Sequence, residues 1–85
     1  MDDCWIYGKA SIYDNARVFG NARVYGNASV YDNACVYENA CIYGDAHVYG
    51  NTHISGIASI FDHAHICANA TISGKANIYN NTHIF

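Results

Sequence analysis

Aliphatic residues return at every sixth position along the whole chain, and no insertion or deletion interrupts them. These residues are Ile6, Ile12, Val18, Val24, Val30, Val36, Ile42, Val48, Ile54, Ile60, Ile66, Ile72, Ile78 and Ile84. A small residue, usually Ala, stands two positions before each of them. Because side chains two residues apart in a strand point to the same side, the pattern predicts one short strand per repeat. Its aliphatic and small residues should face a shared interior.

The remaining columns of the repeat predict its outward face and its corner. All eight Tyr and all three Phe directly follow an aliphatic residue, so their rings should point outward. All seven Gly stand in the next column, where Asp, Glu and Asn are their usual replacements, and Asn dominates the column after that. Gly accepts a positive φ without a clash, and Asn and Asp tolerate one. Each repeat should therefore be a strand of about four residues followed by a corner of about two.

A repeat of this kind predicts an all-β solenoid. A globule of 85 residues has a marginal core, whereas a solenoid buries each repeat against its neighbours. One aliphatic and one small residue per strand leave a narrow interior, which three strands would enclose. We therefore predict a single domain over residues 1–85, made of fourteen repeats, with about 18 residues and three strands per coil and about 4.7 coils. The six-residue period does not set the hand of the coil.

The sequence VYGNAS at residues 24–29 resembles the hexapeptide repeat of left-handed β-helix proteins. In that family an aliphatic residue is often followed by Gly, with Asn three positions later and a small residue four positions later. The resemblance covers the whole chain, although Tyr or Phe stands where the family usually has Gly. The stretch DCWIY at residues 3–7 is also similar to a segment of uncharacterised bacterial hexapeptide-repeat proteins. The resemblance implies a left-handed, single-stranded parallel β-helix.

The same resemblance raises the question of enzymatic activity. Many members of the family are acyltransferases and some are zinc enzymes of the γ-carbonic anhydrase type. Their sites usually lie between the subunits of a trimer and use an inserted loop. A fold does not carry its activity with it, and no repeat of this chain is interrupted by a loop. We expect a non-catalytic structural module; the alternative is a trimeric acyltransferase-like or carbonic-anhydrase-like enzyme with His residues between subunits.

Residues one coil apart should stack about 4.8 Å from one another and form ladders on the surface. The longest aromatic ladder is Tyr7, Tyr25, Tyr43, Phe61 and Tyr79, and one corner holds Asn15, Asn33, Asn51 and Asn69. Two interpretations of the aromatic ladder remain open: stacking that stiffens the coil, and a lateral surface for self-association. The Asn column is expected to form amide hydrogen bonds between coils.

A third ladder consists of His47, His65 and His83. The simplest interpretation is a polar outward column in which His replaces Ser. Stacked imidazoles can also bind Zn²⁺ or Cu²⁺, which is the only cofactor that the sequence suggests. If the ladder has a role, stacked imidazolium charges should loosen it below about pH 6.

The repeat reaches the last residue without a capping motif. Open strand edges pair readily with another chain, so we expect copies of the protein to stack end to end into filaments. The expected end contacts are Cys4, Ile6, Ile78, Thr82, Ile84 and Phe85.

Composition argues against other partners. The net charge is -3, and the only basic residues, Lys9, Arg17, Arg23 and Lys75, are too scattered for a phosphate-binding surface, so nucleic acid is not an expected partner. No apolar run is long enough to span a membrane, and the first residues lack the segments of a signal peptide. No two of the four Cys lie one coil apart, so disulfides within the chain are not expected. These features favour the cytoplasm, and an extracellular filament remains open.

Overall fold

The computed structural model of the protein describes residues 5–84, and the predicted end contacts at Cys4 and Phe85 lie outside this range. Every repeat contributes one strand of two residues. The strands are β1 Trp5–Ile6, β2 Ser11–Ile12, β3 Arg17–Val18, β4 Arg23–Val24, β5 Ser29–Val30, β6 Cys35–Val36, β7 Cys41–Ile42, β8 His47–Val48, β9 His53–Ile54, β10 Ser59–Ile60, β11 His65–Ile66, β12 Thr71–Ile72, β13 Asn77–Ile78 and β14 His83–Ile84. Residues 5–84 contain no helix, and so none that could cross a membrane.

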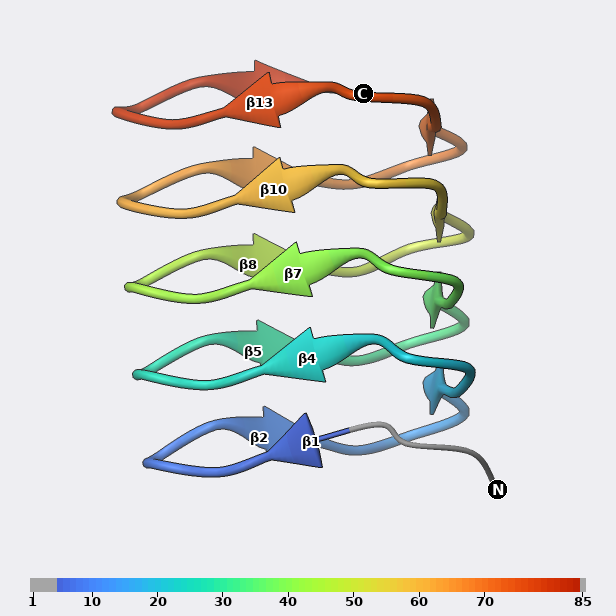
Figure 1. Ribbon diagram of the computed structural model, residues 1–85, viewed down its shortest axis with the longest axis vertical. Coiled ribbons are helices and arrows are strands. Elements are labelled where there is room, and N and C mark those ends of the chain that lie inside the picture. Colours follow the sequence, from blue (N-terminus) through green and yellow to red (C-terminus); the bar gives the residue numbers. More distant parts are fainter. Residues whose placement is uncertain (1–4, 85) are drawn as a thin grey trace.

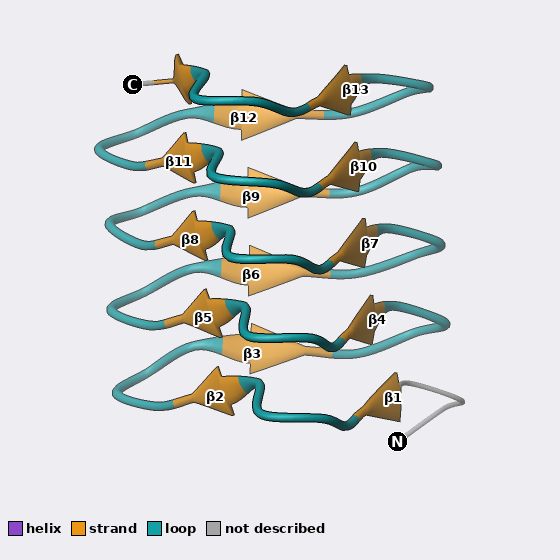
Figure 2. Cartoon of the chain, turned by 90° about the vertical axis from the view of Figure 1, so that its left-hand side faces the viewer, coloured by secondary structure: helices purple, strands orange, loops and turns teal. Residues whose placement is uncertain are grey.

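The strands form three parallel sheets in which strands three repeats apart are neighbours. The first sheet has the order β1-β4-β7-β10-β13, the second β14-β11-β8-β5-β2 and the third β12-β9-β6-β3. Val24 pairs with Ile42, a separation of 18 residues that recurs along each sheet, so the predicted coil length is confirmed. Figure 1 shows the coils stacked along the long axis. Followed from β1 through β2 to β3 in Figure 2, the chain winds as a left-handed coil.

The strands are shorter than the predicted four residues, because the chain turns by a third of a revolution in every repeat. Pairing between coils nevertheless continues past the ends of the strands. In one repeat, the N–H groups of Ser29, Tyr31 and Asn33 donate to carbonyl groups of the next coil, each at 2.9 Å. These hydrogen bonds, together with those between the paired strands, tie each strand and its corner to the coil above.

The interior is a narrow column of aliphatic and small side chains, as the period predicts. In the middle coils these residues are completely buried; Val24, Ala40 and Ile42 have no exposed surface. The same columns are less covered in the outer coils, where Ile6 is 48% exposed and Ile84 is half-buried. The burial of each interior side chain thus depends on having a coil on both sides.

One interior residue has a polar group without a partner. Thr52 stands in the column that Ala usually occupies, and its side chain is completely buried. Its Oγ1 atom has no hydrogen-bond partner. By contrast, the exposed Thr82 donates from Oγ1 to the carbonyl oxygen of Tyr79 at 2.7 Å. An unsatisfied buried hydroxyl costs about 1–3 kcal/mol, so Thr52 is a local weak point of the core.

The corners confirm the prediction of positive φ. Every residue of the Gly and Asp column from Gly8 to Asn80 has a positive φ, between 58° at Asp14 and 76° at Gly50. This column holds the first residue of each corner. The six residues that replace Gly there are three Asp, one Glu, one Asn and one Ala. Asp and Asn tolerate this conformation better than most residues, which explains their presence.

Candidate functional site

The aromatic ladder runs along the whole first sheet. Its rings follow β1, β4, β7, β10 and β13 in turn, and each ring stacks on the next because the strands pair in register. Ring centroids lie 4.9 Å apart for Tyr7–Tyr25 and Tyr25–Tyr43, 5.0 Å for Tyr43–Phe61 and 5.4 Å for Phe61–Tyr79, with planes within 10° of parallel. The two outer rings are about half exposed and the three inner rings are partly buried. The predicted ladder is confirmed as a structure.

Neighbouring groups affect the chemistry of this ladder. Burial raises the pKa of the Tyr25 phenol above its ordinary value, and Cys41 and the adjacent rings raise it further. The guanidinium of Arg23 acts in the opposite direction. The phenol therefore stays protonated and remains a hydrogen-bond donor at neutral pH.

Beside the aromatic ladder lies a column in which most side chains are smaller than the rings. It is formed by the outward residues on the other side of the same strands, namely Arg23, Cys41, Ser59 and Asn77. Trp5 begins this column, but its side chain is not described. Cys41 and Ser59, in the middle, are small and partly buried. The first sheet therefore carries a row of rings next to a row of mostly smaller side chains, and we call these two rows the aromatic ridge and the side channel.

The other two sheets carry shorter aromatic ladders. On the second sheet Tyr13, Tyr31 and Tyr49 stack at 4.9 and 5.0 Å, and Cys67 takes the place of a ring on the next strand. On the third sheet Phe19 stacks on Tyr37 at 5.1 Å, and the column then changes to Ser55. Within residues 5–84, only the first sheet carries rings on all of its strands.

The His ladder is also confirmed as a stack. His47 and His65 have ring centroids 5.0 Å apart, and His65 and His83 4.7 Å, with planes within 14° of parallel. Among residues 5–84, no group of three or more His, Cys, Asp or Glu side chains is arranged to hold a metal ion. Two nitrogen ligands of one zinc ion lie at most about 4 Å apart, so stacked rings would have to turn before sharing a metal. Metal binding by the His ladder stays a prediction.

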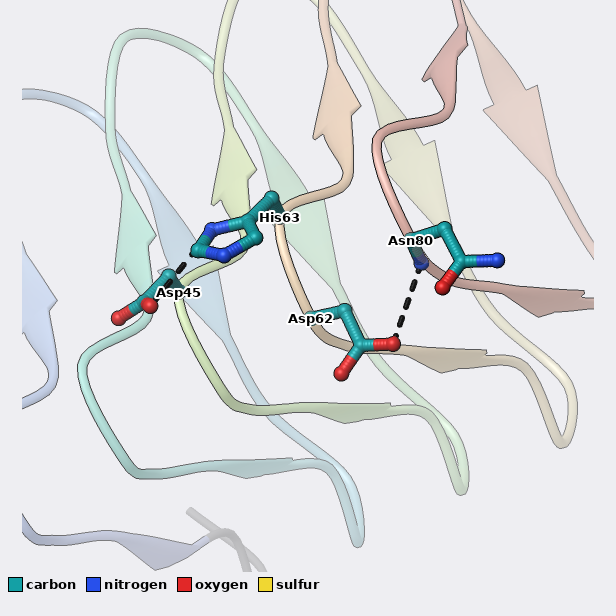
Figure 3. A network of polar contacts seen from close by, with 4 residues as sticks. All are labelled: Asp45, Asp62, His63 and Asn80. Carbon is teal, nitrogen blue, oxygen red and sulfur yellow. Dashed lines mark hydrogen bonds and ion pairs between the residues drawn. The ribbon is translucent and has the colours of Figure 1, made fainter.

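The central imidazole of the His ladder resists protonation. Burial lowers the pKa of His65, and the neighbouring His47, His83 and His63 lower it further. His63 itself lies at a corner, where its Nδ1 atom is 3.6 Å from Asp45 Oδ2 (Figure 3). Protonation of His65 would therefore add a positive charge beside other imidazoles in a partly buried position.

Acidification should destabilise the fold through His65. Because its folded pKa is lowered, the unfolded chain binds the proton more readily. The stability from neutral His65 is thus complete above the unfolded pKa of about 6.5 and is lost as the pH falls below it. We expect the melting temperature to be lower at about pH 5 than at about pH 8, and we expect His65→Ser to reduce this difference. His53→Ser on the third sheet is the control and should keep it. An equal melting temperature at both pH values in the unmodified protein would contradict the prediction.

Amide side chains link the coils at one corner. Asn33 Nδ2 donates to Asn51 Oδ1 at 3.1 Å, and Asn51 Nδ2 donates to Asn69 Oδ1 at 3.2 Å. These bonds confirm the amide ladder for three of the four predicted residues. The hollow beside them, lined by Asp14, Asn15, Asp32, Asn33, Gly50 and Asn51, is shallow and open to solvent.

Carboxylates bind backbone N–H groups at the corners, which the sequence analysis did not predict. Asp32 accepts from Gly50 N at 3.2 Å and Glu38 from Gly56 N at 2.7 Å. Asp62 accepts in the same way from Asn80 N at 3.2 Å (Figure 3). The signal was present in the sequence, because each acidic residue stands in the positive-φ column 18 residues before its donor.

The described cysteines are free thiols that project from different sheets. Cys35 belongs to the third sheet and Cys41 to the first, and Cys67 follows a strand of the second. This agrees with the expectation that no disulfide forms within the chain, as far as residues 5–84 are concerned. Cys4 lies outside the described residues.

Comparison with known proteins supports the solenoid. A family model described as YdcK Beta solenoid repeat matches residues 10–25, 16–32 and 22–38. The three matches begin six residues apart, each in the small-residue column, so they follow the same register as the strands. No curated protein and no solved structure matches the chain. The matches cover residues 10–38 and indicate a β-solenoid repeat, without confirming the hexapeptide-repeat family.

Proposed function

We propose that this chain is a non-catalytic structural module that associates with copies of itself, end to end along the coil axis. The observation that carries the proposal is the difference in burial between coils. Val24 has no exposed surface, whereas Ile6, directly below it in the same interior column, is 48% exposed. At the other end, Ile78 and Ile84 are only partly buried. A copy of the same chain stacked at each end would cover both of these end surfaces.

The backbone hydrogen bonds give the contact a direction. Outward residues donate their N–H groups to the coil above, from Tyr7 N to Val24 O at 3.1 Å up to Cys67 N to Ile84 O at 2.9 Å. In the last described coil, the same donors, such as Asn77 and His83, meet no further coil within residues 5–84. The first coil correspondingly offers carbonyl acceptors. The two ends are thus complementary, and a head-to-tail contact of this type generates open filaments.

The register of the repeat fits such a continuation. Fourteen repeats of six residues correspond to two thirds of a coil beyond four whole coils. A second copy in register would therefore be rotated by about a third of a revolution and would rise by roughly 22 Å. Tyr79 would then stack on Tyr13 of the next copy, so an aromatic ladder would continue across the junction.

Two features support a non-catalytic role. The His rings stack along one another instead of converging with a nucleophile or a carboxylate, which an acid–base site needs. The side chains between coils form repeated ladders of rings and amides, which stiffen a rod. No observation specifically favours the trimeric enzyme alternative.

Electron microscopy and sedimentation of the purified protein test the proposal. We expect filaments of unmodified protein, and Ile6→Lys should abolish them because it places a charge in the end contact. Ile57→Lys is a matched control, since Ile57 is similarly exposed, at 55%, but lies at a corner away from both ends. A monodisperse monomer or compact trimer at high concentration, without fibres, would contradict end-to-end association.

A further inference from the structure

The first sheet carries its outward side chains in two parallel rows, one of rings and one of mostly smaller residues. Its aromatic ridge and side channel lie side by side on the same strands, and both run the length of the sheet. The smallest side chains of the side channel lie near its centre, where Cys41 and Ser59 stand beside Tyr43 and Phe61. We infer that two copies of the chain pair through this face, side by side with parallel coil axes. The inference rests on the proposed self-association and names a second, lateral surface for it.

Symmetry decides how the two faces meet. A two-fold axis parallel to the coil axis reverses the strand direction, so each aromatic ridge lies over the side channel of the partner copy. A two-fold axis along the strands preserves the strand direction, so ridge meets ridge and the two channels face each other. Only the first arrangement fills the channel with rings and avoids a gap, which close packing requires. The two copies therefore run parallel.

The parallel arrangement also keeps each strand at the same height in both copies. We call a strand with its ring and its channel residue a rung. The ring planes of Tyr7 and Tyr25 differ by only 1°, and those of Tyr25 and Tyr43 by 3°, so the sheet is nearly untwisted and the rungs stay in register. Each ring then faces the channel residue of its own strand in the partner copy.

The facing residues are chemically matched. Tyr25 meets Arg23 of the partner copy, a cation–π pair whose phenol remains a hydrogen-bond donor. Tyr43 meets the thiol of Cys41, and sulfur–aromatic contacts are favourable. Phe61 meets Ser59, the smallest residue of the channel. In the opposite arrangement, Tyr25 would lie against Phe61 and Arg23 would lack a ring.

The other faces do not offer the same fit. On the second sheet, Ser11 and Ser29 stand beside the first two rings, but His47, His65 and His83 occupy the rest of that column, and the ring column changes to Cys67 after Tyr49. On the third sheet the ring column changes to Ser55 after Tyr37, so no continuous ridge forms. Within residues 5–84, the pairing surface is thus confined to the first sheet.

The size of the face sets the strength of the contact. Five rungs spaced about 4.8 Å apart bury roughly 800 Å² in total when two copies pair, which is below the usual size of a stable dimer. Isolated chains should therefore pair weakly. Along a filament in which each copy is turned by about a third of a revolution, every third copy presents its first sheet to the same side, so the contacts along that side repeat and strengthen the pairing through multivalency. The lateral surface would then link each filament to parallel neighbours on several sides.

Two charge substitutions distinguish the arrangements. Tyr25 and Phe61 are each stacked between two rings, one rung away from the centre of the ladder, so Tyr25→Glu and Phe61→Glu remove the same stacking. In the parallel pair, Glu at position 25 faces Arg23 of the partner copy, whereas Glu at position 61 faces Ser59. In the opposite arrangement the two changes are equivalent.

The measurement is sedimentation equilibrium in an Ile6→Lys background, which blocks end-to-end growth. We expect dimers at high micromolar concentration, a dissociation constant raised at least about tenfold by Phe61→Glu, and a change below about threefold for Tyr25→Glu. Tyr31→Glu, in a stack on the second sheet, should leave the dimer intact, and circular dichroism checks the fold of each variant. Equal weakening by the two substitutions, or a monomer at about 1 mM, would overturn the inference.

Mass per length of filaments separates the two proposals. Filaments of unmodified protein should associate laterally and show more than one copy for each rise of roughly 22 Å. Filaments with one copy per rise would refute lateral pairing and leave end-to-end association standing. Dimers of the Ile6→Lys protein, with no filaments of the unmodified protein, would refute end-to-end association and support lateral pairing.

Discussion

Gly50→Ala should destabilise the protein by about 3 kcal/mol, whereas Gly74→Ala should cost only about 1 kcal/mol. The two glycines occupy the same column, with φ of 76° and 70°. They differ in what lies above them. A Cβ atom at Gly50 would lie 2.6 Å from the backbone nitrogen and 2.7 Å from the carbonyl oxygen of Ala68, whereas a Cβ at Gly74 would meet nothing within 4 Å.

The physical reason is that the obstacle at Gly50 is backbone. Both substitutions place a Cβ atom in the left-handed region, which costs about 1–2 kcal/mol. Only Gly50→Ala also forces two coils apart at a corner where Asn51 N donates to Ala68 O at 2.6 Å. Overpacking of this kind typically costs about 1–3 kcal/mol more. The difference between the variants therefore measures the close approach of the coils alone.

Urea denaturation measures both variants. The midpoint should fall much further for Gly50→Ala than for Gly74→Ala, with an unchanged slope if unfolding stays cooperative. Equal midpoints would show that the corner opens without cost, and that Gly is kept at position 50 for its φ alone.

The corners reveal two solutions to one problem. Where Gly stands, the next coil can approach closely, and no side chain from the Gly position reaches the N–H group of the residue above. At Asp32, Glu38 and Asp62, the carboxylate accepts a hydrogen bond from the N–H group of the residue above, at 2.7 Å in the bond from Gly56 N to Glu38. A charge-assisted hydrogen bond of this type offsets part of the conformational cost of a non-Gly residue at positive φ. This explains why the column mixes Gly with Asp and Glu.

Much of the fold could be predicted because the residue type in each column of the repeat is set by one local structural requirement. Alternation placed Val24 and Ala28 inside and Tyr25 outside, and the narrow interior indicated the 18-residue coil that the pairing of Val24 with Ile42 confirms. The coil length then implied that the rings stack, because residues 18 positions apart must lie above one another. The hand of the coil was implied only by the resemblance to left-handed β-helices.

The features that could not be predicted depend on individual side chains. The carboxylate of Asp62 reaches the N–H of Asn80 only because the corner bends it toward the next coil. Thr52 fits the small-residue column by size, and nothing in the pattern shows that its hydroxyl lacks a partner. Strand length was overestimated because alternation continues through residues such as Tyr31 that pair with the next coil outside the regular strands.

Ile42→Ala should cost about 4 kcal/mol, whereas Ile6→Ala should cost about 1 kcal/mol in dilute protein. Ile42 is completely buried on β7, the central strand of the first sheet, and Ile6 is 48% exposed on β1. Removing a buried branched side chain creates a cavity that the coils above and below cannot close, because their backbones are fixed by hydrogen bonds. At Ile6 solvent already occupies one side, so little cavity forms.

A second expectation concerns the slope of the urea unfolding transition. A solenoid is stabilised by contacts between neighbouring coils, so a cavity in the middle weakens the coupling between its two halves. Ile42→Ala should therefore lower the slope of the urea transition as well as its midpoint, whereas Ile6→Ala should leave the slope unchanged. Repeating the Ile6→Ala measurement at high concentration adds a test of end-to-end contact, since burial of Ile6 by a second copy would raise its cost toward that of Ile42→Ala. A cost that stays the same at all concentrations would show that Ile6 remains exposed to solvent.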